Sequence, residues 1–370
     1  MDILVLGGTG AMGTPLVEEL AKRGNCVYVT TRKKRTGRIN IEYIQGDPHD
    51  EEFVKSLCSR HFNVIIDFMI YDLEYFTRVS KVFTEAADQY VFISSARVYA
   101  GSEKRMTEEN ARLLDVIEDN DYLKTNEYAL KKAREENILK ESEIQNWTIV
   151  RPYITYNTNR LQLGTLEKEF WLRRALLGKT VVITNKTAKA KTALTYGNDV
   201  SLGIANIAGN NDSLGQIYHI VNEQSHTWMD ILELYNTIFC EKEGRRFKYK
   251  ILDDAETLGQ VIGNIYQLKY DRFYNREFDS SKIKQISKSE INFTSVDTGL
   301  RRCLQEFLEN PVFDVHLDWA YEGYLDRLCN ETSDISSIPG LKDKIRYLSW
   351  KWIPTPIMIR IRNAIHKNKK

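Results

Sequence analysis

A glycine-rich turn near the start of the sequence constrains the fold of this chain more than any other feature. Glycines stand at Gly7, Gly10 and Gly13. The apolar run 3–6 before them has the composition of a buried strand, and segment 15–24 after them repeats apolar residues at helical spacing. The glycines therefore lie at a strand-to-helix turn. There a backbone without Cβ atoms can bend tightly and approach a pyrophosphate held at the helix N-terminus.

The spacing of these glycines, G-x-x-G-x-x-G, differs from the commonest dinucleotide fingerprint, G-x-G-x-x-G. It resembles the turn of the short-chain dehydrogenase/reductase superfamily, in particular its extended branch of nucleotide-sugar epimerases, dehydratases and reductases. The resemblance assigns NAD or NADP binding to the turn, through Gly7, Gly10, Ala11, Met12 and Gly13. The fold that it implies is α/β, with a Rossmann-like doubly wound parallel sheet and a small C-terminal α/β substrate cap.

The bulk properties agree with a folded cytoplasmic protein of more than one core. A chain of 370 residues is too long to fold around a single small core. Its 52 basic residues nearly balance its 51 acidic ones, so the protein has no net charge that would attract nucleic acid. The five cysteines are scattered without a C-x-x-C pair, which fits reduced thiols and predicts no metal site. No apolar run reaches the ~20 residues of a membrane-spanning helix. Because the first strand begins at residue 2, no signal peptide is expected.

The order of the expected elements predicts the domain boundaries. Strands and helices alternate through residues 1–155, and segments near 195–225 resemble the family's return to the core sheet. We expect these parts to form an NAD(P)-binding Rossmann domain and residues 156–330 to form mostly the substrate cap. Residues 331–370 lie outside the resemblance and form a basic amphipathic tail.

The end of the second expected strand, 26–31, bears on the choice of cofactor. In a Rossmann unit an acidic residue there binds the free 2′-OH of the adenosine ribose, whereas an arginine accommodates a 2′-phosphate. Arg32 stands at this position, and residues 33–35 are also basic. The sequence therefore favours NADP over NAD, with a solvated basic turn as the alternative. The resemblance assigns the adenine amino group to Asp47, which follows the third expected strand.

The candidate catalytic residues follow the fifth expected strand, 90–93. Residues 94–99, Ser-Ser-Ala-Arg-Val-Tyr, resemble the S-S-x-x-V-Y segment of the extended family. Tyr128 and Lys132 are spaced i, i+4 on an expected helix, so the ammonium can lie near the phenol. A cation there favours loss of the phenolic proton, which lets Tyr128 act as acid or base; a surface pair is the alternative. The resemblance assigns a hydrogen bond to the substrate oxygen to Ser95 and contact with the nicotinamide ribose to Lys132.

Candidate substrate-binding residues follow the sixth expected strand. Tyr153, Tyr156 and Asn157 lie where the family's substrate loop begins. Arg173 and Arg174 lie on the next expected helix, and a guanidinium can bind a phosphate through two hydrogen bonds. Ordinary loop packing and solvated helix charges are the alternatives for these residues.

Together these features predict an NAD(P)-dependent enzyme that transfers hydride at a carbinol or keto carbon of a nucleotide-linked sugar. Ala96 and Arg97 stand where the family's 4,6-dehydratases carry an acidic pair, which argues against dehydration. Arg32 favours a reductase, whereas the frequency of activities in the family favours an epimerase, and both remain open. The alternative is a non-catalytic or RNA-binding regulatory member; the neutral net charge and the complete set of catalytic residue types weigh against it.

The C-terminal segment 341–370 carries nine basic residues and one acidic residue, interleaved with tryptophan and isoleucine. A basic amphipathic segment with tryptophan can lie on an anionic bilayer as a peripheral contact. Docking on the enzyme itself or on a second subunit is the alternative. The resemblance implies a homodimer formed through paired long helices, for which 72–88 and 120–140 are candidates.

Overall fold

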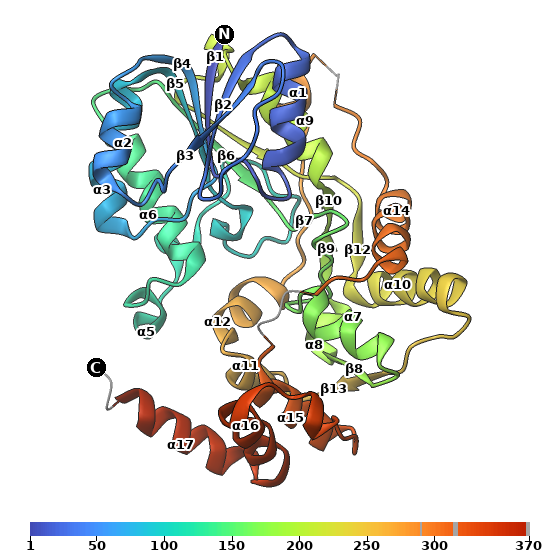
Figure 1. The fold of residues 1–370 in the computed structure, drawn as a ribbon. Coiled ribbons are helices and arrows are strands. Elements are labelled where there is room, and N and C mark those ends of the chain that lie inside the picture. The colour runs from blue at the N-terminus through green and yellow to red at the C-terminus, as the bar shows by residue number, and fades with distance from the viewer. Residues whose placement is uncertain (289–290, 314–316, 368–370) are drawn as a thin grey trace. The chain divides into compact units, whose positions relative to one another are not determined.

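The computed structural model describes residues 1–288, 291–313 and 317–367, and the chain divides into two compact units (Figure 1). Unit 1 comprises Met1–Arg160, Thr192–Ser225 and Asn275–Leu300. Unit 2 comprises Leu161–Lys191, His226–Tyr274 and Arg301–Lys370. Each unit has its own helices and strands.

A seven-stranded sheet with the order β11-β6-β5-β4-β1-β2-β3 forms the centre of unit 1, and every neighbouring pair of strands is parallel. Its strands are β1 (Asp2–Leu6), β2 (Cys26–Thr31), β3 (Ile41–Gln45), β4 (Phe62–Asp67), β5 (Ala87–Ile93), β6 (Trp147–Pro152) and β11 (Gln216–Ile220). The direction of winding reverses between β1 and β4. In doubly wound sheets ligands bind at this point, outside the carboxyl ends of the strands. The predicted Rossmann-like sheet is confirmed.

Helices cover both faces of this sheet, which explains why its strands are apolar on both sides. Ile3 and Val5 of β1 pack in one hydrophobic core with α1 and α9, whereas Leu4 and Leu6 pack in a second core with α2, α3 and α6. The helices of unit 1 are α1 (Gly13–Lys22), α2 (Glu51–Leu57), α3 (Leu73–Glu85), α4 (Leu113–Val116), α5 (Asn120–Leu123), α6 (Tyr128–Lys140), α9 (Gly197–Ile207) and α13 (Ser281–Ile286), with the 3₁₀ turns η1 (Ala96–Val98) and η2 (Asn211–Ser213). A short parallel pair, β7 (Thr155–Tyr156) and β10 (Thr195–Tyr196), adds to the unit.

The helix expected over 120–140 is divided in the structure into α5 and α6. The Thr125 hydroxyl donates to the Tyr122 carbonyl (2.7 Å), and the Glu127 carboxylate accepts from the Ala129 N–H (2.8 Å). Such local side-chain bonds compete with the helical ladder and favour a helix start. Tyr128 is therefore the first residue of α6 instead of an interior one.

Unit 2 is mainly helical and includes the C-terminal tail. Its helices are α7 (Lys168–Leu176), α8 (Asn185–Lys189), α10 (Trp228–Glu243), α11 (Ala255–Ile262), α12 (Ile265–Gln267), the π-helical turn η3 (Leu268–Arg272), α15 (Trp319–Leu328), the 3₁₀ turn η4 (Ile335–Ser337), α16 (Gly340–Trp352) and α17 (Thr355–Lys367). Strands β8 (Val181–Thr184) and β13 (Tyr249–Leu252) pair in parallel. Strands β9 (Lys191–Ala193) and β12 (Ser225–Thr227) and helix α14 (Val296–Glu309) span the boundaries between units. Within the described ranges, no helix is both long enough and apolar enough to cross a bilayer.

Candidate active site

The glycine-rich turn between β1 and α1 is packed against protein atoms at Gly7 and Gly13, and it has free space at Gly10. Gly7 has a φ of +71° and donates its N–H to the Thr30 hydroxyl (3.1 Å). A Cβ on Gly13 would lie 2.6 Å from the backbone of Gly8, so only glycine lets α1 begin this close to the turn. A Cβ on Gly10 would meet no protein atom within 4 Å. The open side at Gly10 leaves room for a ligand.

The carbonyl groups of the turn are bound on the protein side. The Ala11 carbonyl accepts from Asn157 Nδ2 (3.4 Å), and the Met12 carbonyl accepts from the Ser201 hydroxyl (2.7 Å). Helix α1 then begins at Gly13; the Thr14 N–H donates to the Gly10 carbonyl (3.0 Å), and Pro15 has no N–H. The helix dipole and the N–H of Gly13, at the open end of the helix, favour a bound anion such as a pyrophosphate.

A cavity of about 320 Å³ lies beside this turn. It brings together cofactor-binding candidates from three separate segments of the sequence, since its lining includes Gly7, Gly10, Arg32 and Asp47 beside His49 and Met69. The first two belong to the glycine-rich turn, Arg32 follows β2, and Asp47 follows β3. Glycine, basic and acidic groups thus meet in one cavity, and these residues fit the pyrophosphate, ribose and adenine of a dinucleotide.

Arg32 is exposed at the rim of this cavity. In the part of the chain that the structure describes, the Arg32 guanidinium forms no hydrogen bond or ion pair with another residue. Two other arginines between β2 and β3 have partners within the protein. Arg38 forms an ion pair with Glu18, and Arg35 lies over the ring of Tyr43. Arg32 is therefore available to an anionic group of a ligand.

His49 is a residue of this cavity that the sequence analysis missed. It donates to the Asp47 carboxylate from its backbone N–H (3.1 Å) and from ring Nδ1 (2.8 Å), and its Nε2 lies 3.1 Å from the Ile70 carbonyl oxygen. Burial opposes the imidazolium, but these acceptors outweigh it and raise the pKa of His49. The same hydrogen bonds lower the pKa of Asp47, which keeps its carboxylate ionised and fixed in position. The sequence signal that could have identified His49 is its position two residues after Asp47, the aspartate assigned to the adenine amino group.

Ser95 and Tyr128 are linked through Arg97. Ser95 lies just beyond the carboxyl end of β5, and its hydroxyl accepts a hydrogen bond from the Arg97 N–H (3.2 Å). The Arg97 guanidinium lies 5.3 Å from the centre of the Tyr128 ring and forms an ion pair with Glu127, the residue before it. Arg97 thus joins the turn after β5 to the start of α6, and the two predicted catalytic residues lie at one edge of the sheet.

Lys132, one turn further along α6, has a side chain enclosed by the protein. Only 1% of Lys132 is exposed, and its Nζ lies 3.0 Å from the Glu135 carboxylate and 4.4 Å from the centre of the Phe92 ring in β5. Burial raises the pKa of Glu135. The pairing of Lys132 with a buried carboxylate was not predicted, because Glu135 stands in a highly charged stretch that resembles a solvated helix face.

A second buried carboxylate, Asp67, lies at the carboxyl end of β4. It accepts hydrogen bonds from the Tyr90 hydroxyl and the Met69 N–H, each 2.8 Å long. Burial raises the pKa of Asp67 to about 6, against the opposing effect of these donors and of the nearby Lys132 charge. The interior next to the predicted catalytic lysine therefore holds two carboxyl groups, Asp67 and Glu135, that resist ionisation.

Helix α6 is fixed to the sheet by a third buried carboxylate, Glu136. The Ser94 hydroxyl donates to it (2.6 Å), and Arg151 of β6 donates through Nε (2.8 Å) and Nη2 (2.6 Å). Burial disfavours the carboxylate, but the Arg151 charge and these hydrogen bonds outweigh it and lower the pKa of Glu136. This network orients the helix that carries Tyr128 and Lys132.

The predicted substrate residues of unit 1 are packed inside it. Tyr153 and Tyr156 are both buried; the ring of Tyr153 lies 5.2 Å from that of Phe278, and the ring of Tyr156 lies 5.7 Å from that of Tyr196. Asn157 reaches the glycine-rich turn, as described above. Tyr153 and Tyr156 thus pack in the core and Asn157 supports the cofactor turn, while contact of these three residues with a substrate stays a prediction.

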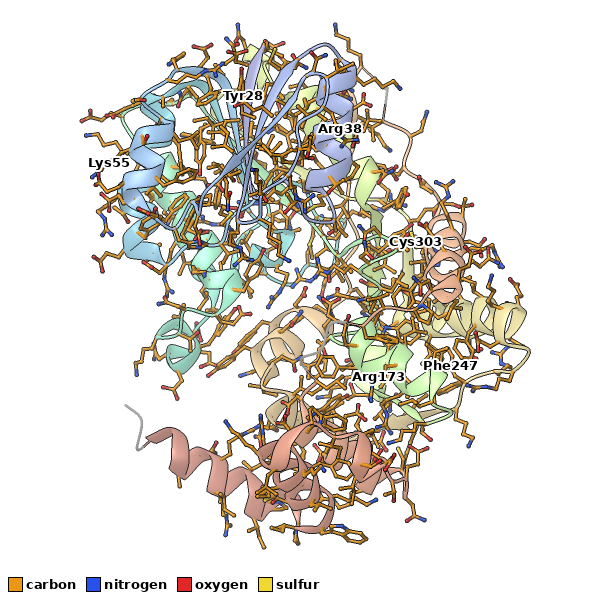
Figure 2. The ribbon with its side chains drawn as sticks, in the orientation of Figure 1. Tyr28, Arg38, Lys55, Arg173, Phe247 and Cys303 are labelled. Carbon is orange, nitrogen blue, oxygen red and sulfur yellow. The ribbon has the colours of Figure 1, made fainter. Side chains whose placement is uncertain are left out.

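The two predicted phosphate ligands of unit 2 differ in their surroundings. Arg174 is buried, and its guanidinium forms ion pairs with Glu322 (2.8 Å), Asp326 (3.0 Å) and Glu331 (2.8 Å). These three carboxylates satisfy the guanidinium, so it holds α7 to α15 and leaves no group for a phosphate. Arg173 is half-buried, with its guanidinium carbon 5.6 Å from the centre of the Trp319 ring (Figure 2).

Comparison with known proteins agrees with this geometry. A family described as NAD(P)H-binding matches residues 7–191, half of the chain. No curated protein sequence shows significant similarity to the chain.

Solved structures with the same fold include three complexes with NAD. MoeE5 with UDP-glucuronic acid and NAD is 16% identical, with a TM-score of 0.64 over 84% of this chain and 100% of that one. The dTDP-glucose 4,6-dehydratase of Bacillus anthracis str. Ames with NAD is 17% identical (TM-score 0.63, 84% and 97%). The UDP-glucuronic acid 4-epimerase of Bacillus cereus with UDP-glucuronic acid and NAD is 15% identical (TM-score 0.62, 84% and 100%). This chain therefore belongs to the NAD(P)H-binding family and has the Rossmann-like fold of the extended short-chain dehydrogenases/reductases.

Proposed function

We propose that the protein is an NAD(P)H-dependent enzyme that transfers hydride at a carbinol or keto carbon of a nucleotide-linked sugar. The observation that carries this proposal is the position of Ser95, Tyr128 and Lys132. All three lie where β5 and α6 meet, in the same unit as the glycine-rich turn and its cavity. The nucleotide sugars bound by two of the structural relatives supply the substrate class.

The cofactor, when bound, supplies or accepts the hydride. Tyr128 transfers the proton of the substrate hydroxyl, and Ser95 donates a hydrogen bond to the same substrate oxygen. Lys132 stabilises negative charge on the phenol oxygen during proton transfer once its ammonium turns from Glu135 and the Phe92 ring toward Tyr128. In this structure, Glu135 pairs with the Lys132 ammonium at 3.0 Å.

Simple hydride transfer is favoured over elimination of water. Elimination needs an acid beside the catalytic serine, and here the two following residues are Ala96 and Arg97. Arg97 is already bound to Glu127 and covers the ring of Tyr128, so it cannot act as that acid. Both an epimerase, which recycles its cofactor, and a ketoreductase, which exchanges it, fit these residues. The free guanidinium of Arg32 supports NADP and hence a reductase.

The first experiment identifies the nucleotide carried by the purified protein by mass spectrometry after denaturation. Retained NAD⁺ supports an epimerase, and an empty site with preference for NADPH supports a reductase. The protein is then assayed with a panel of UDP- and dTDP-linked hexoses and their keto derivatives.

Tyr128→Phe tests the catalytic role. Loss of the phenol should lower turnover at least about 100-fold and leave cofactor affinity unchanged, because the hydroxyl acts only on the reacting oxygen. Tyr274→Phe, which changes an exposed tyrosine, serves as the matched control. Full activity of the Tyr128→Phe enzyme would refute the assignment. A wild-type protein that binds no nicotinamide nucleotide and turns over no substrate would favour the non-catalytic alternative.

A further inference from the structure

Helix α16 is fixed to unit 2 along one face. The Tyr347 hydroxyl donates to the Asp326 carboxylate of α15 (2.8 Å), and Trp350 is buried. Gly323 of α15 lies so close to α16 that a Cβ there would collide with the Tyr347 carbonyl oxygen. Because this face is packed, the helix is a rigid part of the unit, and its opposite face must point away from the packing.

That opposite face of α16 is apolar. Leu341, Ile345 and Trp352 are spaced four and seven residues apart, which aligns them along one side of a helix; Leu348 at the border of this side is half-buried and packs against the core of Trp319 and Tyr347. The exposed fractions are 74% for Leu341, 55% for Ile345 and 72% for Trp352. Large apolar side chains at this exposure along one stripe are unusual on a protein surface and indicate a binding surface.

Helix α17 repeats this arrangement. Its inner side holds Met358, which is buried, and the half-buried Arg362, whose guanidinium donates to the Val261 carbonyl (3.0 Å). Its outer side carries Ile357, Ile361 and Ala364, which are exposed and spaced four and three residues apart. Figure 1 shows the two helices as consecutive elements at the end of the chain. Both present an apolar stripe on the side opposite their packing contacts.

Basic residues border these stripes. Lys342 and Arg346 lie on one side of the α16 stripe and Lys344 on the other, and Arg360 lies beside the α17 stripe. Arg346 contacts Asp318 at 3.4 Å but remains half-exposed. The single acidic residue of α16 and α17 is Asp343. The surface is therefore an apolar strip between cations.

We propose that the outer faces of α16 and α17 bind the surface of an anionic phospholipid bilayer. Apolar residues with a tryptophan enter the boundary between headgroups and acyl chains, and flanking lysines and arginines bind anionic headgroups. A second copy of the chain is a poorer occupant, because docking two such faces would bring like charges together. RNA is also a poorer one, because among the side chains of these helices that the structure describes, up to residue 364, Trp352 is the single exposed aromatic on which a base could stack.

Trp352 provides a direct measurement. The chain has six tryptophans, and the other five, Trp147, Trp171, Trp228, Trp319 and Trp350, are all buried. The full-length protein is titrated with vesicles of phosphatidylcholine containing phosphatidylglycerol and with vesicles of phosphatidylcholine alone. We expect a blue shift of tryptophan emission and co-sedimentation with the anionic vesicles only, and no shift in the Trp352→Phe variant.

Substitutions of apolar residues within the strip and of a basic residue beside it test the apolar and the electrostatic contributions to binding separately. Ile345→Ser and Ile361→Ser should each weaken anionic vesicle binding roughly tenfold, and Lys342→Gln about fivefold. Ile39→Ser and Lys124→Gln, at exposed positions of unit 1, should leave binding unchanged. Circular dichroism confirms that each variant remains folded.

Three outcomes would overturn the proposal. One is the absence of binding to anionic vesicles, and another is equal binding to both kinds of vesicle. The third is insensitivity of binding to the α16 and α17 substitutions. A concentration-dependent blue shift without lipid would instead identify a second copy as the occupant, and tighter binding of an RNA oligonucleotide through the same residues would identify nucleic acid.

Discussion

An alanine at position 10 should separate cofactor binding from folding. Gly10 has no positive φ, and a Cβ built on it meets no protein atom within 4 Å. The methyl group of Gly10→Ala therefore enters the open side of the turn, where the pyrophosphate of a dinucleotide needs close approach to the backbone. Gly13→Ala is the matched comparison, because its methyl group would lie 2.6 Å from the Gly8 backbone.

Gly10→Ala should lower the affinity for the nucleotide without lowering stability, whereas Gly13→Ala should lower stability. Gly10→Ala removes conformational freedom from the unfolded chain at a compatible site, so its free energy of unfolding should be unchanged or about 0.4–1 kcal/mol higher. Its affinity for NAD(P)H should fall at least about tenfold, which corresponds to about 1.4 kcal/mol of binding free energy. Gly13→Ala must displace backbone and should lower the free energy of unfolding by about 1–3 kcal/mol.

Binding is measured by isothermal titration calorimetry with NADH and NADPH, and stability by thermal melting of the same preparations without nucleotide. If Gly10→Ala bound both nucleotides as tightly as the wild type, the pyrophosphate would not lie against this turn and the reasoning would be refuted. A loss of stability in Gly10→Ala equal to that in Gly13→Ala would show that the turn is not open at this position.

Further predictions concern single side chains. Arg32→Asp should weaken NADPH binding far more than NADH binding, because it replaces a cation beside the ribose with an anion; unchanged preference in a titration would remove Arg32 from cofactor recognition. Glu136→Gln should lower the free energy of unfolding by about 3–5 kcal/mol in denaturant titrations, because it leaves the Arg151 charge buried without its carboxylate. A change below about 1 kcal/mol would contradict that estimate. Asp67 has a pKa raised from 3.8 to about 6, so the stability that it contributes below its unfolded pKa is lost as the pH rises from about 4 to 6. Asp67→Asn keeps an acceptor for Tyr90 and should remove the part of this loss that falls between pH 4.5 and pH 7, about 2 kcal/mol, from the change in unfolding free energy between these two pH values. Parallel pH profiles would disprove the role of Asp67.

Local sequence patterns predicted the framework of unit 1. The β-rich runs and the apolar spacing of 15–24 identified the strands and α1, because period and composition depend on neighbouring residues alone. The expected helix over 120–140 was wrong in one respect, since hydrogen bonds of Thr125 and Glu127 divide it and put Tyr128 at the start of α6. The signal for this break, two polar residues before the tyrosine, is weak against a long helical pattern.

The surroundings of charged side chains could not be predicted in the same way. Arg173 and Arg174 are adjacent and chemically identical in the sequence, yet one lies on a tryptophan ring and the other among three carboxylates that follow it by 148 to 157 residues. Glu135 and Glu136 are likewise adjacent, and burial raises the pKa of one while Arg151 lowers that of the other.

The sequence by itself determined the glycine-rich turn, the alternation of strands and helices, and the residue types at the carboxyl edge of the sheet. Tertiary structure alone decided that Lys132 is enclosed with Glu135, that His49 binds Asp47 in the cofactor cavity, and which face of α16 remains exposed. The physical reason is that the free energy of a charge or an apolar group depends on whether water or protein surrounds it. That environment is created by segments far apart along the chain and is set only when they pack together.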